Sequence, residues 1–419
     1  MLNSRKGPEA GPLGAPGRRI ARPRLRTKAI RALLPALVCV LAMAGCGATK
    51  PPKPVPGTVP PPVKASEPAP VAGAPLSGVP QPWAQLAGSL AREGLPPEKL
   101  RGFFGSPGLS YNPGPMETKL RELFPIFFRS DLTKAVQERL YQLGYDVAID
   151  GRNGSGTRRA IAAYRNDHGG GAARVSQELA DELDGKLKGG RVRSLADYSP
   201  PPARAPDRSS THGQFTNAGA VAKLRGMYQA DLPVFERMER AYHVPGKLVA
   251  SLMWIETGYG SYFGKARAAA SLASMAASAD YGLIGPHVSD LARDEESREF
   301  LAATAAKRGA WARDELAALL RFAWENGHDP MEFPGSIYGA IGFGQFMPSN
   351  IARYAVDGDG DQRIDLFQKQ DAVFSIGNFL REHGWSGDMS SEDKRRAVIR
   401  KYNNDGVYVN TVLYVMEHL

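Results

Sequence analysis

Glu256 is the residue whose type and spacing first suggest catalysis. Leu248, Leu252 and Glu256 are spaced four residues apart, which places them on one side of a helix. Pro245 suits the first turn of that helix, and Gly258, or the glycine two residues later, suits its end. The spacing therefore predicts that Glu256 lies at the C-terminal end of an apolar stripe, on the side that turns inward.

An inward-facing carboxyl group at this position favours acid catalysis. Desolvation raises the pKa of a carboxyl group, and the negative end of the helix dipole acts in the same direction. A glutamic acid that stays partly protonated near neutral pH can give a proton to the leaving oxygen of a glycosidic bond. The pattern alone leaves two alternatives for Glu256, an ion pair with Arg or Lys and simple exposure at the helix end.

A second group of carboxylates alternates along a short loop that begins at Asp357, and oxygen ligands at alternate positions suit calcium. The loop is not an ordinary EF-hand, because Gln362 stands at its sixth position in place of Gly and Gln368 at its twelfth in place of Glu. Asp371 could close a longer loop. The spacing supports five ligand residues, namely the side chains of Asp357, Asp359, Asp361 and Asp371 and the carbonyl of Arg363. The alternative is an acidic surface turn, and any ion here should be structural.

The rest of the composition excludes several other functions. The seven histidines are scattered, with no His-x-x-x-His pair and no thiol partners, so no further metal site is predicted. The formal net charge is +10, but nine of the 53 Lys and Arg residues and one of the 43 acidic residues precede Cys46, so the remainder is nearly neutral. A nearly neutral body without basic-aromatic interleaving argues against nucleic acid as a partner. The sequence also lacks a Ser nucleophile elbow and a phosphate-binding loop.

Residues 1–45 combine a basic segment with an apolar run and predict a lipoprotein signal peptide. The run is short for a membrane span, which needs roughly 20 apolar residues. It ends in Ala-Met-Ala-Gly before Cys46, which resembles a bacterial lipobox, and we expect Cys46 to be lipidated. The protein would then be anchored in the cell envelope, at the outer membrane, and would face the periplasm. Signal peptidase cleavage near the same place is the alternative.

The elements that must position the candidate residues lie beyond this leader. Residues 46–82 predict an extended, polyproline-like tether, because twelve of the 33 prolines lie between Pro51 and Pro82. Residues 83–127 show helical spacing of apolar residues and no visible chemistry.

Residues 128–190 are expected to form a small domain of their own. Leu132, Val136 and Leu140 make an apolar stripe with helical spacing, and Thr157 suits the N-cap of a second helix. The segment resembles the small three-helix peptidoglycan-binding-like domain, through a Gln, a Leu-Gly-Tyr and an Asp-Gly at corresponding positions. The alternative is a small helical domain with a structural role.

Residues 191–213 form a linker rich in Pro, Ser and Arg, and residues 214–419 carry the remaining motifs. In order, these are Glu-Thr-x-Tyr-Gly from Glu256, Gly-Ser and Gly-Phe-Gly-Gln-Phe-Met-Pro-Ser within 335–349, and Tyr-Asn at 402–403. Together they resemble the lytic murein transglycosylase B family, of the membrane-bound lipoprotein type. The resemblance implies a mainly α chain with a lysozyme-like catalytic domain. Residues 83–127 look like the start of that domain, so the small domain would be inserted into it.

The resemblance also implies roles for individual residues. Glu256 matches the single catalytic acid/base of the family, Ser336 and Gln345 match residues that line the sugar subsites, and Asn403 and Tyr408 match active-site positions. The implied reaction cleaves the β-1,4 bond between MurNAc and GlcNAc and forms 1,6-anhydroMurNAc, with no cofactor needed for the chemistry. The expected partners are peptidoglycan glycan strands and, through the N-terminal lipid, the membrane. A hydrolytic muramidase on the same fold and a non-catalytic peptidoglycan-binding lipoprotein are the alternatives.

Overall fold

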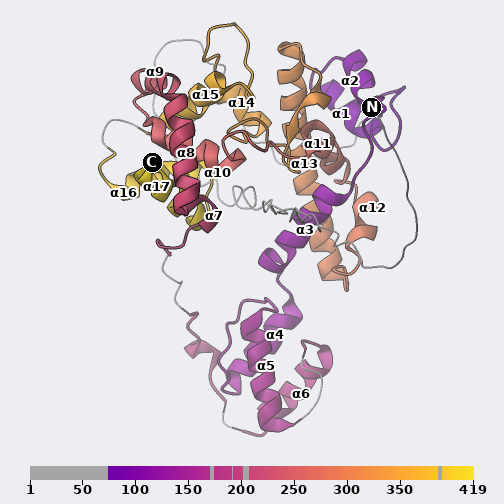
Figure 1. Cartoon of the computed structure of the whole chain (residues 1–419). Coiled ribbons are helices and arrows are strands. Elements are labelled where there is room, and N and C mark those ends of the chain that lie inside the picture. The colour runs from indigo at the N-terminus through magenta and orange to yellow at the C-terminus, as the bar shows by residue number, and fades with distance from the viewer. Residues whose placement is uncertain (1–73, 170–173, 191, 202–206, 386–388) are drawn as a thin grey trace, which may run out of the picture. The chain divides into compact units, whose positions relative to one another are not determined.

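The computed structural model describes residues 74–169, 174–190, 192–201, 207–385 and 389–419. Most of these residues are helical (Figure 1), and the mainly α prediction is confirmed. The sheet within these ranges pairs two short antiparallel strands, β1 (Ala266–Arg267) and β2 (Pro334–Gly335). The same ranges contain no helix with the length and apolar character needed to cross a membrane. The predicted signal peptide, Cys46 and most of the predicted tether lie outside the described residues.

One hydrophobic core joins two segments of the chain that are far apart in sequence. Leu90 and Leu100 belong to the same buried cluster as Leu252 and Leu316. The first segment contains α1 (Ala84–Arg92), α2 (Pro97–Phe104) and α3 (Gly114–Phe127). The second contains α7 (Gly213–Thr216), α8 (Ala218–Ala230), α9 (Leu232–Tyr242), α10 (Gly246–Thr257), α11 (Ala268–Ala277), α12 (Tyr281–Ile284), α13 (Glu295–Glu325), α14 (Pro348–Tyr354), α15 (Lys369–Glu382), α16 (Glu392–Tyr402) and α17 (Gly406–His418). Short 3-10 turns η1 (Leu195–Asp197), η2 (Gly285–Val288) and η3 (Pro330–Glu332) complete the list.

Between these two segments, three helices surround a separate small core, as predicted. They are α4 (Asp131–Gln142), α5 (Ser155–His168) and α6 (Gln177–Leu187). Val136, Leu140, Ile161, Tyr164 and Leu183 fill the core between them, and each is fully or almost fully buried. The small domain is therefore inserted into the larger one, which resumes after it.

The second helix of the small domain begins three residues earlier than the sequence indicated. Gly154 is the N-cap of α5, and Thr157 lies inside its first turn, so the prediction of Thr157 as the cap was wrong. The hydroxyl of Thr157 instead donates to the carbonyl of Arg152 (2.8 Å) and accepts from the buried amide of Gln137 (2.9 Å). Gln137 also accepts the backbone N–H of Gly151 at 2.8 Å, which fixes the turn before α5. Tertiary contacts of a buried amide thus override the local capping preference of Thr157.

Helix α10 is buried on nearly all sides. It begins after Pro245, which is extended and serves as the N-cap, and it ends at Gly258, which is left-handed with φ 58°. Both ends agree with the residues that predicted them. A helix that is apolar all around must lie inside the protein, and α10 packs against α8, α9, α15 and α17.

Candidate active site

Glu256 lies in the last turn of α10 and is partly buried. The phenolic O–H of Tyr408, from α17, donates to Glu256 Oε1 at 2.6 Å. Burial raises the pKa of Glu256 to about 8, and the hydrogen bond from Tyr408 acts in the opposite direction by stabilising the carboxylate. The Glu256 carboxyl group is therefore largely protonated at neutral pH.

The residues that follow Glu256 turn sharply and tie α10 to the glycine-rich loop that ends at Met347. The Thr257 hydroxyl donates to the carbonyl of Phe343 at 3.2 Å and accepts the N–H of Gly260 at 3.0 Å. Tyr259 is left-handed with φ 60°, which is costly for a residue with a side chain. Its hydroxyl is held by the carboxylate of Asp231 at 2.8 Å. This local strain is balanced by specific contacts, as is common at functional sites.

The glycine-rich loop follows β2 and carries Ser336 and Gln345. Ser336 Oγ accepts the N–H groups of Tyr338 (3.2 Å) and Ala340 (3.1 Å), so the hydroxyl holds the turn that follows it. Gly339, with φ 88°, lies against Leu272 of α11, where a Cβ atom would come within 2.5 Å of that side chain. The path of the loop therefore requires glycine at position 339.

Gln345 has a left-handed backbone with φ 47°, in the tight turn that closes the loop. Its side-chain Nε2 donates to the carbonyl of Gly342 at 3.2 Å and approaches the carbonyl of Phe263 at 3.5 Å. Gly344, just before it, accepts a hydrogen bond from the hydroxyl of Tyr402. These contacts connect the loop both to the residues after α10 and to the end of α16.

Asn403 and Tyr408 lie on either side of the turn between α16 and α17, and both are buried. The Asn403 side chain accepts the N–H of Asp405 at 3.2 Å. Asp405 in turn is the N-cap of α17 and accepts the N–H of Tyr408 at 2.7 Å. This turn therefore fixes the backbone position of Tyr408, from which its hydroxyl group contacts Glu256.

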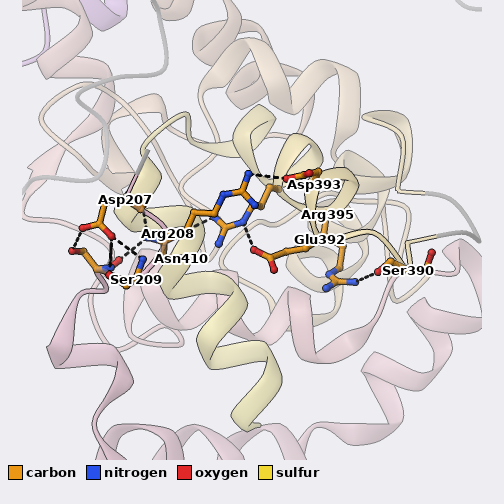
Figure 2. Close-up of polar contacts among 10 residues, drawn as sticks. Asp207, Arg208, Ser209, Ser390, Glu392, Asp393, Arg395 and Asn410 are labelled. Atoms are coloured by element: carbon orange, nitrogen blue, oxygen red, sulfur yellow. Dashed lines mark hydrogen bonds and ion pairs between the residues drawn. The ribbon is translucent and has the colours of Figure 1, made fainter. Parts of the chain in front are cut away.

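A polar network connects helices α16 and α17 to each other and to the residues before α7 (Figure 2). Arg396, which is 7% exposed, donates to Glu392 at 2.5 Å and to Asn410 Oδ1 at 2.8 Å. The amide of Asn410 donates to the carbonyls of Asp207 (3.1 Å) and Ser210 (2.8 Å), just before α7. These hydrogen bonds hold α16, α17 and residues 207–210 together.

The aspartate loop brings three of its predicted ligands together. Carboxylate oxygens of Asp357, Asp359 and Asp361 lie within 4.8 Å of one another. Asp371 is 2% exposed and does not belong to this group of three. Its two oxygens accept the N–H groups of Gly358 (2.8 Å) and Asp365 (2.7 Å) from the two arms of the loop.

The remaining predicted ligand is the carbonyl of Arg363. The backbone at this residue is fixed by its N–H, which donates to Asp361 Oδ1 at 2.8 Å. Asp371 thus closes the loop as the spacing suggested, but it does so by accepting backbone hydrogen bonds.

Comparison with known protein families identifies the domain that contains Glu256. The family described as "Transglycosylase SLT domain" matches residues 193–397. The chain contains a transglycosylase SLT domain. A second family, "Putative peptidoglycan binding domain", matches residues 129–170 within the small domain. The predicted resemblance to lytic transglycosylases, and to the small peptidoglycan-binding-like domain, is confirmed.

The match to the SLT domain includes Glu256, Ser336, Gln345 and the aspartate loop, whereas Asn403 and Tyr408 lie beyond its end. A curated relative, the membrane-bound lytic murein transglycosylase B of Escherichia coli (strain K12), is 27% identical over 258 residues. The alignment covers 59% of this chain and 62% of the relative, so the chain spans less than two thirds of that protein's length.

Two solved structures are also similar to the chain. The lytic transglycosylase SltB1 of Pseudomonas aeruginosa, in a catenated form, has 20% identity and a TM-score of 0.41, covering 62% of this chain and 94% of that one. The Escherichia coli lytic transglycosylase Slt35, in complex with calcium, also has 20% identity and a TM-score of 0.41, covering 68% of this chain and 97% of that one.

The sequence analysis missed two residues that shape the site. Asp405 could have been found, because an Asp just before an apolar helix is a typical N-cap. Glu315 of α13 gave no such signal. It is 4% exposed and accepts the N–H (2.8 Å) and the hydroxyl (2.9 Å) of Ser349, at the start of α14. Glu315 therefore anchors the chain just after the glycine-rich loop, although burial raises the pKa of its carboxyl group.

Proposed function

We propose that this protein is a lytic murein transglycosylase that cleaves the β-1,4 bond between MurNAc and GlcNAc in peptidoglycan and forms 1,6-anhydroMurNAc. The observation that carries the proposal is the Glu256–Tyr408 pair, in which Glu256 lies within the SLT domain and Tyr408 follows the matched residues. Because the pKa of Glu256 is raised to about 8, the residue is a proton donor at neutral pH. The hydrogen bond from Tyr408 fixes one carboxyl oxygen, so the other is available to the substrate.

In the proposed reaction Glu256 first protonates the glycosidic oxygen, and the bond between that oxygen and the anomeric carbon breaks. The carbonyl oxygen of the substrate's own N-acetyl group stabilises the positive charge that develops at the anomeric carbon. The ionised Glu256 then accepts the proton of the muramyl C6 hydroxyl, whose oxygen forms the new bond to the anomeric carbon. Glu256 ends the cycle protonated, as it began, and no water is consumed.

The electrostatics of Glu256 support a mechanism with a single carboxylate. Within the described part of the chain, the pKa of Glu256 is shifted by burial and by the Tyr408 hydroxyl, and no charged side chain contributes. A glycosidase with two carboxylates places them about 5–9 Å apart, where each would affect the pKa of the other. We infer that the substrate's N-acetyl group performs the role of the second carboxylate.

Ser336, Gln345 and Asn403 are proposed to bind the sugars near the reacting bond. Ser336 and Gln345 are partly buried on the loop that packs against the end of α10, and each offers both hydrogen-bond donors and acceptors. Asn403 is more deeply buried, and its oxygen already holds the turn before α17. We therefore expect Asn403 to act chiefly through the position of Tyr408.

The products released from purified peptidoglycan test the proposed reaction. The full chain, purified in detergent, is incubated with peptidoglycan, and soluble fragments are analysed by mass spectrometry. Anhydro products, lighter than reducing muropeptides by the mass of one water, are expected. Reducing products would identify a muramidase, with Glu256 still the acid. Binding to sedimented peptidoglycan without any release would leave a non-catalytic peptidoglycan-binding lipoprotein.

We also propose that the protein acts from the periplasmic face of the outer membrane, anchored by a lipid on Cys46. The lipobox and the proline-rich tether support this location, and so does the relative from Escherichia coli, which is described as membrane-bound. The small domain would help to hold peptidoglycan glycan strands. Mass spectrometry of the mature N-terminal peptide tests the anchor, because lipidated Cys46 is expected and an unmodified residue there would contradict it.

A structural calcium ion in the aspartate loop is a further part of the proposal. The three clustered carboxylates are the kind of ligands that calcium prefers, and the Arg363 carbonyl could complete the set. Thermal unfolding with calcium and with a chelator tests the site. Calcium should raise the melting temperature, and Asp359→Asn should remove the effect. No change up to about 10 mM calcium would exclude it, since even weak calcium modules bind below that concentration.

A further inference from the structure

A buried lysine lies beneath the glycine-rich loop, on a helix far away in sequence. Lys119 belongs to α3 and is 6% exposed. Its ammonium group is 3.0 Å from Glu122 Oε2, one turn further along the same helix. A lysine is rarely buried unless a partner compensates its charge, and this one meets a second partner besides Glu122.

That second partner is Tyr338, two residues after Ser336. The Lys119 ammonium lies 3.9 Å from the centroid of the Tyr338 ring, within the range of a cation–π interaction. The Tyr338 hydroxyl donates to Glu122 Oε2 at 3.1 Å, the same oxygen that Lys119 contacts. Tyr338 is only 3% exposed, so the three side chains form a compact and largely buried cluster.

The cluster is connected directly to the side chain of Ser336. The backbone N–H of Tyr338 donates to Ser336 Oγ, and the N–H of Ser336 donates to the carbonyl of Ala340 at 2.9 Å. A displacement of Tyr338 would therefore change both the position of the Ser336 hydroxyl and the path of the loop. The Glu256–Tyr408 pair is formed by other helices, and the cluster does not include it.

We propose that Lys119 and Glu122 are positioning residues that hold Tyr338, and through it the Ser336 turn, in the conformation that binds the glycan. The inference rests on the proposed function, because it assigns these residues to the binding of the same substrate. It also gives α3, the last helix before the inserted domain, a role beyond packing. The cluster should affect substrate binding and leave the acid unchanged.

The energetics of buried ion pairs distinguish this role from a purely structural one. Replacing both members of a buried ion pair with apolar side chains often leaves stability unchanged or raises it, whereas removing one member is costly when the other charge stays buried. The Glu122 side chain is 26% exposed, so water can solvate its carboxylate when the lysine charge is removed. Lys119→Met keeps the length of the side chain and removes the charge. If the charge serves only the fold, the melting temperature should fall. If it positions the Ser336 turn, binding should weaken while the melting temperature is maintained.

The experiment measures binding of a purified GlcNAc-MurNAc tetrasaccharide to the full chain by calorimetry, in the Glu256→Gln background that prevents turnover. Lys119→Met and Tyr338→Phe are each expected to raise Kd about tenfold, as for the loss of one hydrogen bond to a charged group. Lys119→Arg should restore most of the affinity, because it keeps a cation over the ring. The variant that combines Lys119→Met with Tyr338→Phe should raise Kd by less than the product of the two single increases, because both residues act through one cluster.

Glu117→Gln is the matched control, because Glu117 lies on the same helix but pairs with Arg121 at the surface. It should leave Kd unchanged. In the active background, the alkaline limb of the pH–rate profile should be the same for Lys119→Met and for the wild type. A Kd within twofold of the wild type for both Lys119→Met and Tyr338→Phe overturns the inference, and so does an equal loss in Glu117→Gln. Failure of the wild type itself to release fragments would overturn the proposed function instead.

Discussion

Glu256 and Asp357 carry the same functional group within one domain, yet the pKa of the first is raised to about 8 and that of the second is lowered. Glu256 is withdrawn from water and receives a hydrogen bond from the Tyr408 hydroxyl. Asp357 loses some hydration too, but its two oxygens accept the N–H groups of Gly360 and Gln362, which outweigh that loss. The first group is suited to donate a proton, and the second to remain a carboxylate.

Asp371 shows whether burial or backbone hydrogen bonds have the stronger effect on the pKa of a carboxyl group when both are present. Its carboxylate accepts two backbone N–H groups, as Asp357 does, but it is buried and lies near Asp357 and Asp359. Burial, with a smaller effect of the neighbouring charges, raises the pKa of Asp371. Backbone donors alone therefore do not keep a carboxyl group acidic, and exposure to solvent is also needed.

Glu256→Gln is expected to have the largest effect. The amide keeps the shape of the side chain but cannot give a proton, so turnover should fall by about 10³-fold or more. Binding to peptidoglycan should persist. Product release and sedimentation measure the two properties, with Glu382→Gln, at an exposed position on α15, as the control. Residual turnover above one tenth of the wild type would contradict the assignment of Glu256 as the acid.

The same substitution should change how stability depends on pH. Because the pKa of Glu256 is raised on folding from 4.5 to about 8, its protonated form favours the folded state, and this contribution is lost as the pH rises from about 4.5 through about 8. Relative to Glu256→Gln, the wild type should lose up to a few kcal/mol over this range, at about 1.4 kcal/mol per pKa unit. Denaturant unfolding at a series of pH values measures the difference.

Asp357→Asn should change the pH dependence of stability in the opposite direction. The pKa of Asp357 is lowered on folding, so its contribution is present above the unfolded value of 3.8 and is lost as the pH falls. The wild type should therefore lose stability relative to Asp357→Asn only on the acid side. If both variants showed the same pH dependence, the contrast between the two environments would be wrong.

Tyr408→Phe should have a moderate effect on rate and should shift the pH profile. The Tyr408 hydroxyl lowers the pKa of Glu256, so its removal should move the alkaline limb of kcat/KM to higher pH. At neutral pH the rate should fall about tenfold, because one hydrogen bond that orients the acid is lost. A limb that moves to lower pH would show that Tyr408 does not stabilise the carboxylate.

Local sequence signals predicted the parts of the site that depend on a single helix. Pro245 and Gly258 gave both ends of α10, and the spacing to Leu252 gave the direction of Glu256. These features depend on backbone geometry within a few residues, which sequence encodes directly. The start of α5 was misplaced by comparison, because the buried Gln137 amide recruits Thr157 for a tertiary contact.

Contacts between distant segments could not be predicted from the residues alone. The hydrogen bond from Tyr408 to Glu256 joins residues 152 positions apart, and Tyr408 entered the candidate site only through a family resemblance. The cluster of Lys119 with Tyr338 spans an even longer stretch, with the small domain in between. A lysine on a helix normally indicates a solvated surface, so its burial became evident only from the packing of α3 against the loop.

Gln362→Gly should have the smallest effect, and it tests the backbone of the aspartate loop. Gln362 is exposed and left-handed with φ 70°, at the position where an ordinary EF-hand has Gly. Glycine would remove the steric cost of that conformation and keep the N–H that Asp357 accepts, although it also frees the unfolded chain. Stability should rise by about 0.5 kcal/mol, as measured by denaturant unfolding. Gly360→Ala, at φ 85° in open space, should lower it by a similar amount. If both substitutions destabilised the protein, the Gln362 side chain would contribute contacts of its own, and the loop would be held by more than its backbone donors.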